Sequence, residues 1–204
     1  MTDPIEALER LRTGNARFVA NELSRAISDV ERARLTSGQE PFAAILGCSD
    51  SRVPTEVVFD QGLGDLFVIR VAGNIVAPSQ IGSIEFAAQK FATRLVVVLG
   101  HTHCGAVEAT IDELLQPDEK QSRNIATIVS RIKPSVIDLL ERGDVTDRDE
   151  LVQKAVRENV RYAANALRHG SDIIEELIGK GELLIVGAEY SLDTGVVEFF
   201  DGMP

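Results

Sequence analysis

Two segments of this 204-residue chain decide its fold: GCSDSRVP at residues 47–54 and GHTHCG at residues 100–105. Each comes at the end of an apolar run that predicts a buried strand, at residues 42–48 and 95–100. Together they hold both cysteines and two of the three histidines. Sheets of the α/β class bind ligands at the carboxyl ends of parallel strands, particularly where the strand order reverses. The sequence therefore predicts a ligand site where these two strands end.

The rest of the chain predicts an α/β fold: a central, mostly parallel sheet of four strands plus an antiparallel edge strand, with helices on both faces. The four parallel strands are expected at residues 42–48, 66–71, 95–100 and 183–188. The last strand, residues 196–200, follows the turn Asp193-Thr194-Gly195. So short a connection permits a hairpin but not a parallel crossover, so this strand should be antiparallel.

Apolar spacing predicts helices at residues 79–92, 104–115, 124–140, 147–168 and 171–178. Ser79 and Ser171 are the expected caps of the first and last of these. Pro134 should kink or split the helix that contains it, because proline removes a backbone donor. No linker or internal repeat divides the chain, so we expect one domain spanning residues 1–204.

A helical arm is predicted at residues 1–40, ahead of the first strand. An apolar stripe runs through residues 4–22, and Gly14 interrupts it, so we expect two short helices there. Turn residues close the arm at residues 36–41. Such an arm has no fixed place in a doubly wound sheet. Packing across a partner subunit and packing on its own domain both remain open.

Composition excludes several classes of function. The formal net charge is -11 and no cluster of Lys or Arg stands out, which argues against a nucleic-acid surface. No uncharged apolar run reaches membrane-spanning length, and the N-terminus lacks the pattern of a secretory signal. We therefore expect a cytoplasmic protein without membrane contact. Two cysteines in a reducing compartment favour metal binding or catalysis over a structural disulfide.

The cysteines and histidines favour a mononuclear zinc site. His101 and Cys104 lie three residues apart on one turn, and Cys48 comes from another strand end. Cysteine and histidine are the preferred ligands of zinc, and a site with three protein ligands leaves a position for water. His103 and His169 are expected to be surface or outer-sphere histidines. The alternative for the two cysteines is that they are small core residues.

Asp50 and Arg52 follow Cys48 closely enough to act on the same site. A carboxylate there can accept a hydrogen bond from a zinc-bound water and orient it, while the guanidinium fork keeps the carboxylate ionised. The alternative is an ordinary surface ion pair or an aspartate cap. Gly62 and Gly64 do not make a phosphate loop, because they precede a strand instead of opening a helix.

At these residues the chain resembles the β-class carbonic anhydrases. Residues 48–54 match the first signature of that family, and the second is matched from Glu85-Phe86-Ala87 through the strand at 95–98 to residues 100–105. Further similar segments extend the resemblance over about residues 42–201. The helical arm also resembles that of the family, where it packs across a dimer.

The resemblance implies one zinc ion per chain on Cys48, His101 and Cys104, with Asp50 and Arg52 as a dyad that orients zinc-bound hydroxide. It implies reversible hydration of carbon dioxide to bicarbonate and a proton, in a homodimer or a dimer of dimers. Implied elements of the substrate pocket are Gly105, Val71 and Gly73, with Gln61 or Phe86 supplied by a partner.

The chain also departs from relatives in the family. Phe86 lacks the hydroxyl that a tyrosine would bring. Some bacterial relatives bind an inhibitory bicarbonate beside a tryptophan just before the first zinc cysteine, but this chain has no tryptophan and carries Ile45 there. That argues against this form of regulation. We expect Asp50 to stay paired with Arg52 at alkaline pH instead of closing onto zinc.

Two other functions remain open at this point. One is a related zinc hydrolase that acts on carbonyl sulfide or carbon disulfide. The other is a non-catalytic zinc module whose site is closed by a fourth protein ligand.

Overall fold

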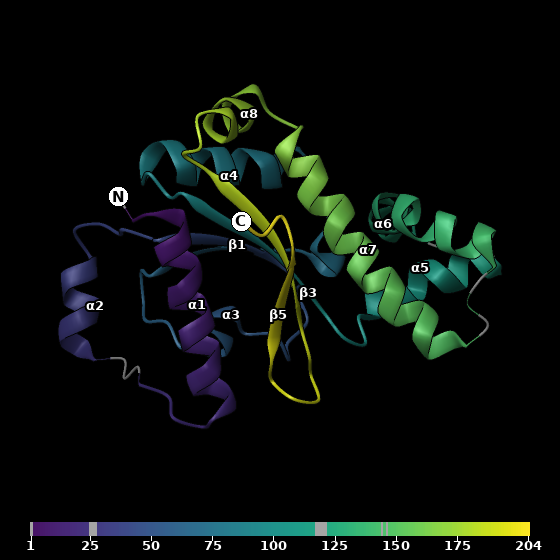
Figure 1. The fold of residues 1–204 in the computed structure, drawn as a ribbon, viewed down its shortest axis with the longest axis horizontal. Coiled ribbons are helices and arrows are strands. Elements are labelled where there is room, and N and C mark those ends of the chain that lie inside the picture. Colours follow the sequence, from purple (N-terminus) through teal and green to yellow (C-terminus); the bar gives the residue numbers. More distant parts are fainter. Residues whose placement is uncertain (1, 25–27, 117–121, 144, 146) are drawn as a thin grey trace.

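The computed structural model describes residues 2–24, 28–116, 122–143, 145 and 147–204. Five strands form one sheet, with helices packed around it (Figure 1). The strands are β1 Ala43–Gly47, β2 Leu66–Arg70, β3 Leu95–His101, β4 Leu184–Tyr190 and β5 Val197–Asp201. The helices are α1 Pro4–Val19, α2 Asp29–Leu35, α3 Thr55–Val58, the 3-10 turn η1 Ala72–Asn74, α4 Pro78–Lys90, α5 Gly105–Leu115, α6 Arg123–Arg142, α7 Arg148–Arg168 and α8 Asp172–Gly179.

The sheet has the strand order β2-β1-β3-β4-β5. The first four strands are parallel, and β5 pairs antiparallel with β4 at the edge, as the short turn before it predicted. The chain moves from β1 outward to β2 and then returns to place β3 on the other side of β1. The strand order therefore reverses between β1 and β3. This is the switch point at which α/β sheets bind ligands.

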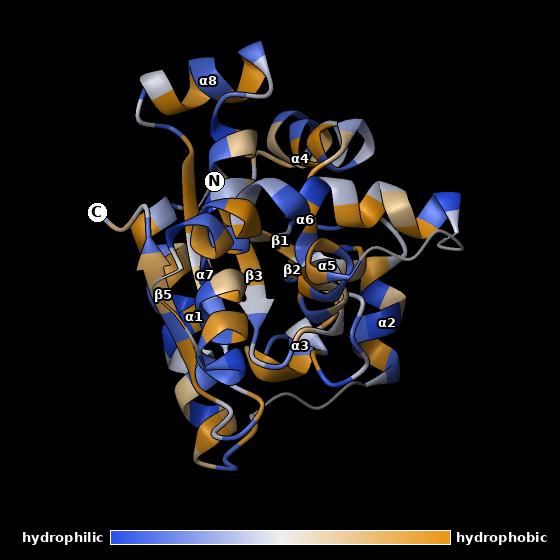
Figure 2. Ribbon diagram, turned by 90° about the vertical axis from the view of Figure 1, so that its right-hand side faces the viewer, coloured by the Kyte–Doolittle hydropathy of each residue, from blue (hydrophilic) through white to orange (hydrophobic). Residues whose placement is uncertain are grey.

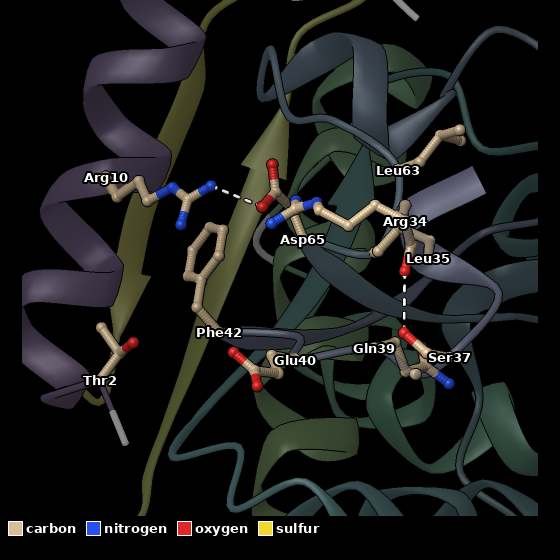
Figure 3. A pocket seen from close by; sticks show the side chains of 12 residues that line it. Thr2, Arg10, Arg34, Leu35, Ser37, Gln39, Glu40, Phe42, Leu63 and Asp65 are labelled. Carbon is tan, nitrogen blue, oxygen red and sulfur yellow. Dashed lines mark hydrogen bonds and ion pairs between the residues drawn. The ribbon is translucent and has the colours of Figure 1, made fainter. Parts of the chain in front are cut away.

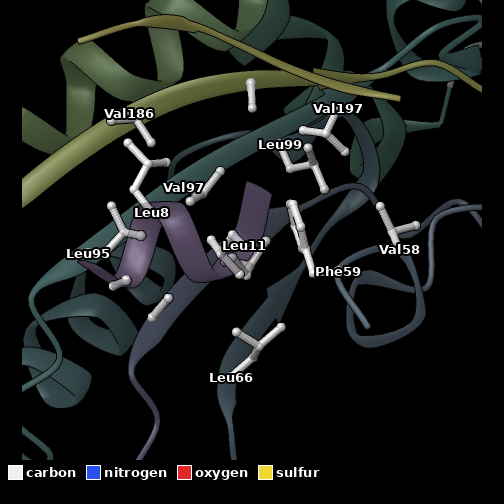
Figure 4. Packing of buried hydrophobic residues seen from close by; sticks show 14 of the residues in the cluster. Leu8, Leu11, Val58, Phe59, Leu66, Leu95, Val97, Leu99, Val186 and Val197 are labelled. Carbon is white, nitrogen blue, oxygen red and sulfur yellow. The ribbon is translucent and has the colours of Figure 1, made fainter. Parts of the chain in front are cut away.

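Alternate residues of each strand face opposite layers, because the side-chain period of a strand is two. One layer holds α1 and the segment around Phe59, packed on the odd-numbered residues of β1 and β3 (Figure 4). The other holds α4, α8 and the C-terminal half of α7, packed on the even-numbered residues. Figure 2 shows that the helices carry hydrophobic and hydrophilic residues side by side, as amphipathic helices do.

A third cluster of apolar residues lies at the carboxyl end of the sheet. Here α5 and α6 pack against the N-terminal half of α7, seen on the right of Figure 1. Cys48 and Cys104 belong to this cluster and are buried in it. The helical layer thus forms an apolar wall around the point where β1 and β3 end.

The arm contains one continuous helix where two were expected. Gly14 lies inside α1 and is buried, so the prediction that it breaks the helix was wrong. A Cβ at this position would lie 1.8 Å from the carbonyl oxygen of Phe59. The glycine therefore permits a close approach of two backbones. Its cost in helix propensity, about 1 kcal/mol, is small enough for tertiary packing to override.

We expect Gly14→Ala to destabilise the protein by at least about 3 kcal/mol, because α1 must move away from Phe59 to admit the methyl group. Gly82→Ala is the matched control. Gly82 is also inside a helix, α4, but a Cβ there meets nothing within 4 Å. That change should stabilise by about 0.5–1 kcal/mol. Urea denaturation measures both, and equal effects would contradict the close-approach explanation.

Two further helix predictions need correction. Pro134 lies within α6, which runs from Arg123 to Arg142 without a break, so of the predicted kink or split the split is wrong. Packing of Ile132 and Val136 in the apolar wall holds both sides of the proline in place. Ser79 does not cap α4, which begins at Pro78 with no side-chain cap. Ser171 does cap α8, through a hydrogen bond from the backbone N–H of Ile174.

The helix α1 packs on the sheet of its own chain. Leu8 and Leu11 are buried against Leu95, Val97 and Leu99 (Figure 4). In the described part of the chain, α2 contributes no buried residue. Packing of the arm on a partner subunit stays a prediction. Over the described residues, no helix combines the length and the apolar character needed to cross a membrane.

Asp60, in the loop before β2, binds the last turn of α1 and the segment that follows it. Its side chain is almost fully buried and accepts hydrogen bonds from the guanidinium of Arg17 and from the backbone N–H and hydroxyl of Ser24. Burial alone would raise the pKa of this carboxyl, but the hydrogen bonds from Ser24 and Arg17 outweigh it and hold the pKa below its usual value.

We expect Asp60→Asn to destabilise by about 2 kcal/mol at neutral pH, because it weakens buried hydrogen bonds to a charged group. A lowered pKa in the folded state adds stability above the ordinary aspartate pKa and loses it as the pH falls. The difference from wild type should therefore shrink below about pH 4. Asp29→Asn, at an exposed ion pair with Arg32, is the control and should change stability by less than about 0.5 kcal/mol. A pH-independent difference in urea midpoint would refute this explanation.

Candidate metal centre and active site

Three potential metal ligands meet at the switch point of the sheet. The donor atoms of Cys48, His101 and Cys104 all lie within 4.8 Å of one another, and all three residues are buried. Cys48 follows β1 directly, His101 is the last residue of β3, and Cys104 immediately precedes α5. Two neighbouring parallel strands therefore deliver the ligands to one point. The structure brings together the set of residues that the sequence predicted.

The hydrogen bonding of His101 suits a metal ligand. Its Nδ1 lies 2.8 Å from the carbonyl oxygen of Thr102, so the Nδ1–H donates there and the lone pair is on Nε2. Nε2 is buried and has no hydrogen-bond partner in the structure. A buried polar atom without a partner is costly. Two cysteine sulfurs and one imidazole nitrogen form a donor set that zinc prefers, so these residues fit that ion.

The two cysteines lie close enough for one thiol to affect the pKa of the other. A hydrogen bond from the Cys104 thiol lowers the pKa of Cys48, and the same bond raises the pKa of Cys104. The backbone N–H of Gly73 also donates to Cys48 Sγ, at 3.4 Å. Because thiolates are the binding form, uptake of a metal here would release a thiol proton.

Asp50 and Arg52 form a bidentate ion pair beside the cluster. Arg52 Nε and Nη2 donate to the two carboxylate oxygens of Asp50, at 3.0 and 2.8 Å, and the backbone N–H of Arg52 donates at 2.9 Å. These bonds hold the pKa of Asp50 well below its usual range. Asp50 Oδ2 lies 3.9 Å from His101 Nε2. An ionised carboxylate of fixed orientation is thus adjacent to the ligand cluster.

Arg70 also belongs to this centre, and the sequence did not predict a role for it there. Its Nε donates to the carbonyl oxygen of Cys48 at 3.0 Å, and its Nη2 donates to that of Asp50 at 2.6 Å. Arg70 ends β2, opposite Gly47 in the sheet register. The available signal was a charged residue at the carboxyl end of a predicted strand. Arg70 donates to two backbone carbonyls, and the sequence does not reveal which carbonyls a side chain will contact.

The other two histidines lie outside the ligand cluster. His103 is exposed, and its Nε2 is 3.7 Å from a carboxylate oxygen of Asp193. His169 follows the end of α7, with its Nδ1 3.5 Å from Glu175. Among the residues that the structure describes, the cluster therefore contains three donor side chains.

Comparison with known proteins gives close relatives over nearly the whole chain. The sequence model of the carbonic anhydrase family matches residues 43–197. Carbonic anhydrase 2 of Mycobacterium tuberculosis is 43% identical over 196 residues, which are 95% of this chain and 91% of that protein. The carbonic anhydrase of Mycolicibacterium smegmatis is 40% identical over 198 residues, 97% of this chain and 93% of that protein.

Similar solved structures identify the class of carbonic anhydrase. One of the tetrameric β-carbonic anhydrases from Sordaria macrospora superposes with a TM-score of 0.75 at 26% identity, covering 83% of this chain and 85% of the other. The β-carbonic anhydrase CafA of Aspergillus fumigatus gives 0.76 at 25% identity, with 97% and 90% coverage. The chain belongs to the β-carbonic anhydrase family. It is an enzyme of this class, as the signature segments predicted.

Three of the five expected pocket residues of this β-carbonic anhydrase lie beside the cluster. Val71 packs against the apolar wall, Gly73 contacts Cys48, and Gly105 begins α5. Gln61 is engaged elsewhere, since its Nε2 donates to the carbonyl of Phe59 and its Oε1 accepts from the arm. Phe86 is half exposed on α4 and packs against other aromatic rings. A role for these two at a partner's site stays a prediction.

Two cavities differ in their relation to this centre. One of about 530 Å³ opens beside it and is lined by Thr102 and His103 together with acidic residues that include Glu108 and Asp149. Another of about 520 Å³ lies between α1, α2 and the start of β1 (Figure 3). Its lining includes Arg10, paired with Asp65. Neither cavity is lined by a predicted site residue, and the first approaches the centre through Thr102 and His103, which lie between His101 and Cys104.

Proposed function

We propose that this β-carbonic anhydrase binds one zinc ion through Cys48, His101 and Cys104 and catalyses the reversible hydration of carbon dioxide to bicarbonate and a proton. The observation that carries the proposal is a buried cluster of three donors, with an unpartnered His101 Nε2, beside the Asp50–Arg52 pair. Three protein ligands leave zinc a position for water. Bound zinc would supply a Lewis acid that lowers the pKa of that water toward neutral.

The protein groups have separate tasks in this proposal. The carbonyl of Thr102 holds the tautomer of His101 that leaves Nε2 free to bind metal. Asp50 accepts a hydrogen bond from the attacking oxygen and directs the oxygen's lone pair toward carbon dioxide. Arg52 keeps this carboxylate ionised and fixes its orientation through the paired fork. Arg70 holds the loop that carries Cys48 and Asp50 through two carbonyls.

Carbon dioxide is small and apolar, so an apolar wall beside the cluster suits it. The partly buried Val71 and the backbone of Gly73 and Gly105 lie next to the cysteines. We propose that they form the substrate pocket, completed by Gln61 or Phe86 of a second copy. The working unit is then a homodimer or a dimer of dimers of one-domain chains, with the residue 1–40 arm across the interface. The tetrameric β-carbonic anhydrases of Sordaria macrospora favour such an assembly.

Stopped-flow measurement of carbon dioxide hydration, with protein of known zinc content and above neutral pH, tests the proposal. Turnover should rise in proportion to zinc content. A zinc-loaded but inert protein would contradict it, and comparing turnover on carbonyl sulfide and carbon disulfide would then identify a related hydrolase. Light scattering gives the oligomeric state, and cell fractionation tests the expected cytoplasmic location.

A further inference from the structure

The segment Thr102–His103 lies between the proposed metal ligands His101 and Cys104 and is hydrogen-bonded to the end of β4 and the turn that follows it. The backbone N–H of Thr102 donates to the carbonyl of Tyr190 at 3.0 Å. The hydroxyl of Thr102 accepts from the backbone N–H of Leu192, also at 3.0 Å. The imidazole of His103 lies 3.7 Å from Asp193. This short segment is therefore held from outside the metal centre.

Both carbonyls of the segment point back at the centre. The carbonyl of Thr102 accepts from His101 Nδ1 at 2.8 Å, and that of His103 accepts from Arg52 Nη2 at 3.2 Å. Arg52 Nη2 is the atom that also holds Asp50 Oδ2. One short stretch of backbone thus orients a proposed metal ligand and the arginine of the dyad at the same time.

The second of these carbonyls depends on an unusual backbone conformation. His103 has a φ of +54°, in the left-handed region that residues other than glycine rarely adopt. Its side chain is 60% exposed, so burial of the imidazole does not require this conformation. Backbone strain of this kind is unfavourable and persists where surrounding contacts hold it. Here those contacts come from the turn after β4.

We propose that His103 is a positioning residue whose left-handed backbone aims its carbonyl at Arg52, so that the arginine fork stays aligned on Asp50. The proposal rests on the proposed function, in which Asp50 orients the attacking oxygen. The backbone of His103 performs this task, and its imidazole does not. Residues that tolerate the left-handed region should therefore replace histidine well, and β-branched residues should replace it poorly.

The test compares His103→Gly, His103→Asn, His103→Ala and His103→Val at equal zinc content. Glycine and asparagine adopt the left-handed region with little strain, alanine less readily, and valine least. We expect His103→Val to have a kcat about tenfold or more below that of the glycine and asparagine variants, with KM little changed, because a misaligned catalytic group costs rate. The kcat of the alanine variant should lie between these values. If the valine variant does not fold, the alanine variant takes its place in the comparison.

Asn21→Val is the matched control for strain. Asn21 is exposed, lies after α1 and has a φ of +58°, so valine meets the same backbone conformation away from the centre. It should lower stability without changing kcat. A second readout does not depend on activity: in ¹⁵N-labelled protein, the Nε–H resonance of Arg52 should stay sharp in the glycine and asparagine variants and broaden in the valine variant.

Two results would overturn the proposal. Equal loss of kcat in all four variants would assign the effect to the imidazole, and equal retention would show that catalysis does not depend on how well residue 103 adopts the left-handed region. A failure of the proposed function can be distinguished from a failure of this proposal. A wild-type protein that does not hydrate carbon dioxide would refute the function, while the Arg52 resonance would still show whether His103 aligns the fork.

Discussion

Cys48→Ser is expected to lose both zinc and carbon dioxide hydration. The variant keeps a small side chain in a buried position but replaces a thiolate by a hydroxyl, which is a poor zinc ligand. Two donors from His101 and Cys104 are too few to retain the ion. We expect less than about a thousandth of wild-type kcat/KM, because removal of a core catalytic element costs three or more orders of magnitude. Stopped-flow assay and metal analysis of the same sample measure both losses.

Ser49→Ala is the control for the Cys48 variant. Ser49 is the next residue on the same loop, and its side chain is exposed. This change should leave zinc content and turnover near those of wild type. A Cys48→Ser protein that retained stoichiometric zinc and normal turnover would exclude Cys48 as a ligand. A protein that retained zinc but lost turnover would assign the cysteine a role other than holding the metal.

Asp50→Asn is expected to keep zinc and lose most of its activity. Asparagine has nearly the shape of aspartate but carries no negative charge, so it neither accepts as strong a hydrogen bond nor pairs with the guanidinium of Arg52. Loss of a positioned acceptor in the transition state costs about 10²–10⁴-fold in rate. We expect kcat to fall within this range while zinc content stays at one per chain.

Asp149→Asn is the matched control for Asp50. Asp149 is an exposed carboxylate that lines the cavity beside the metal centre, so its loss removes the same charge nearby without touching the dyad. It should change kcat by less than about twofold, because exposed charges interact weakly across water. Similar losses in both variants would mean that Asp50 acts through the general electric field around the centre and not through its contact with Arg52.

Arg52 accounts for the low pKa of Asp50, since the hydrogen bonds from its side chain are the largest cause of the shift. The carboxylate is therefore ionised at every pH at which the dyad is intact. A lowered pKa gives stability above the ordinary aspartate value and loses it as the pH falls. The dyad thus remains charged across the neutral and alkaline range where hydration of carbon dioxide is measured.

Much of the fold followed from local pattern. The strands at Ala43–Gly47 and Leu95–His101 are short apolar runs, and the last strand is antiparallel because its turn is too short for a crossover. Gly14 does not end its helix and Pro134 does not split the helix that contains it, because local propensity is weak and packing on the sheet and on the apolar wall overrides it.

The sequence by itself determined the chemistry of the centre: two cysteines and a histidine at strand ends, with Asp50 and Arg52 two and four residues after the first cysteine. These are properties of side-chain type and spacing. Only the tertiary structure decided how the centre is held. Arg70 reaches backbone carbonyls on another strand, and His103 turns its own carbonyl toward Arg52. Every residue carries the same carbonyl group, so its direction is set by backbone angles and packing and leaves no mark in the sequence.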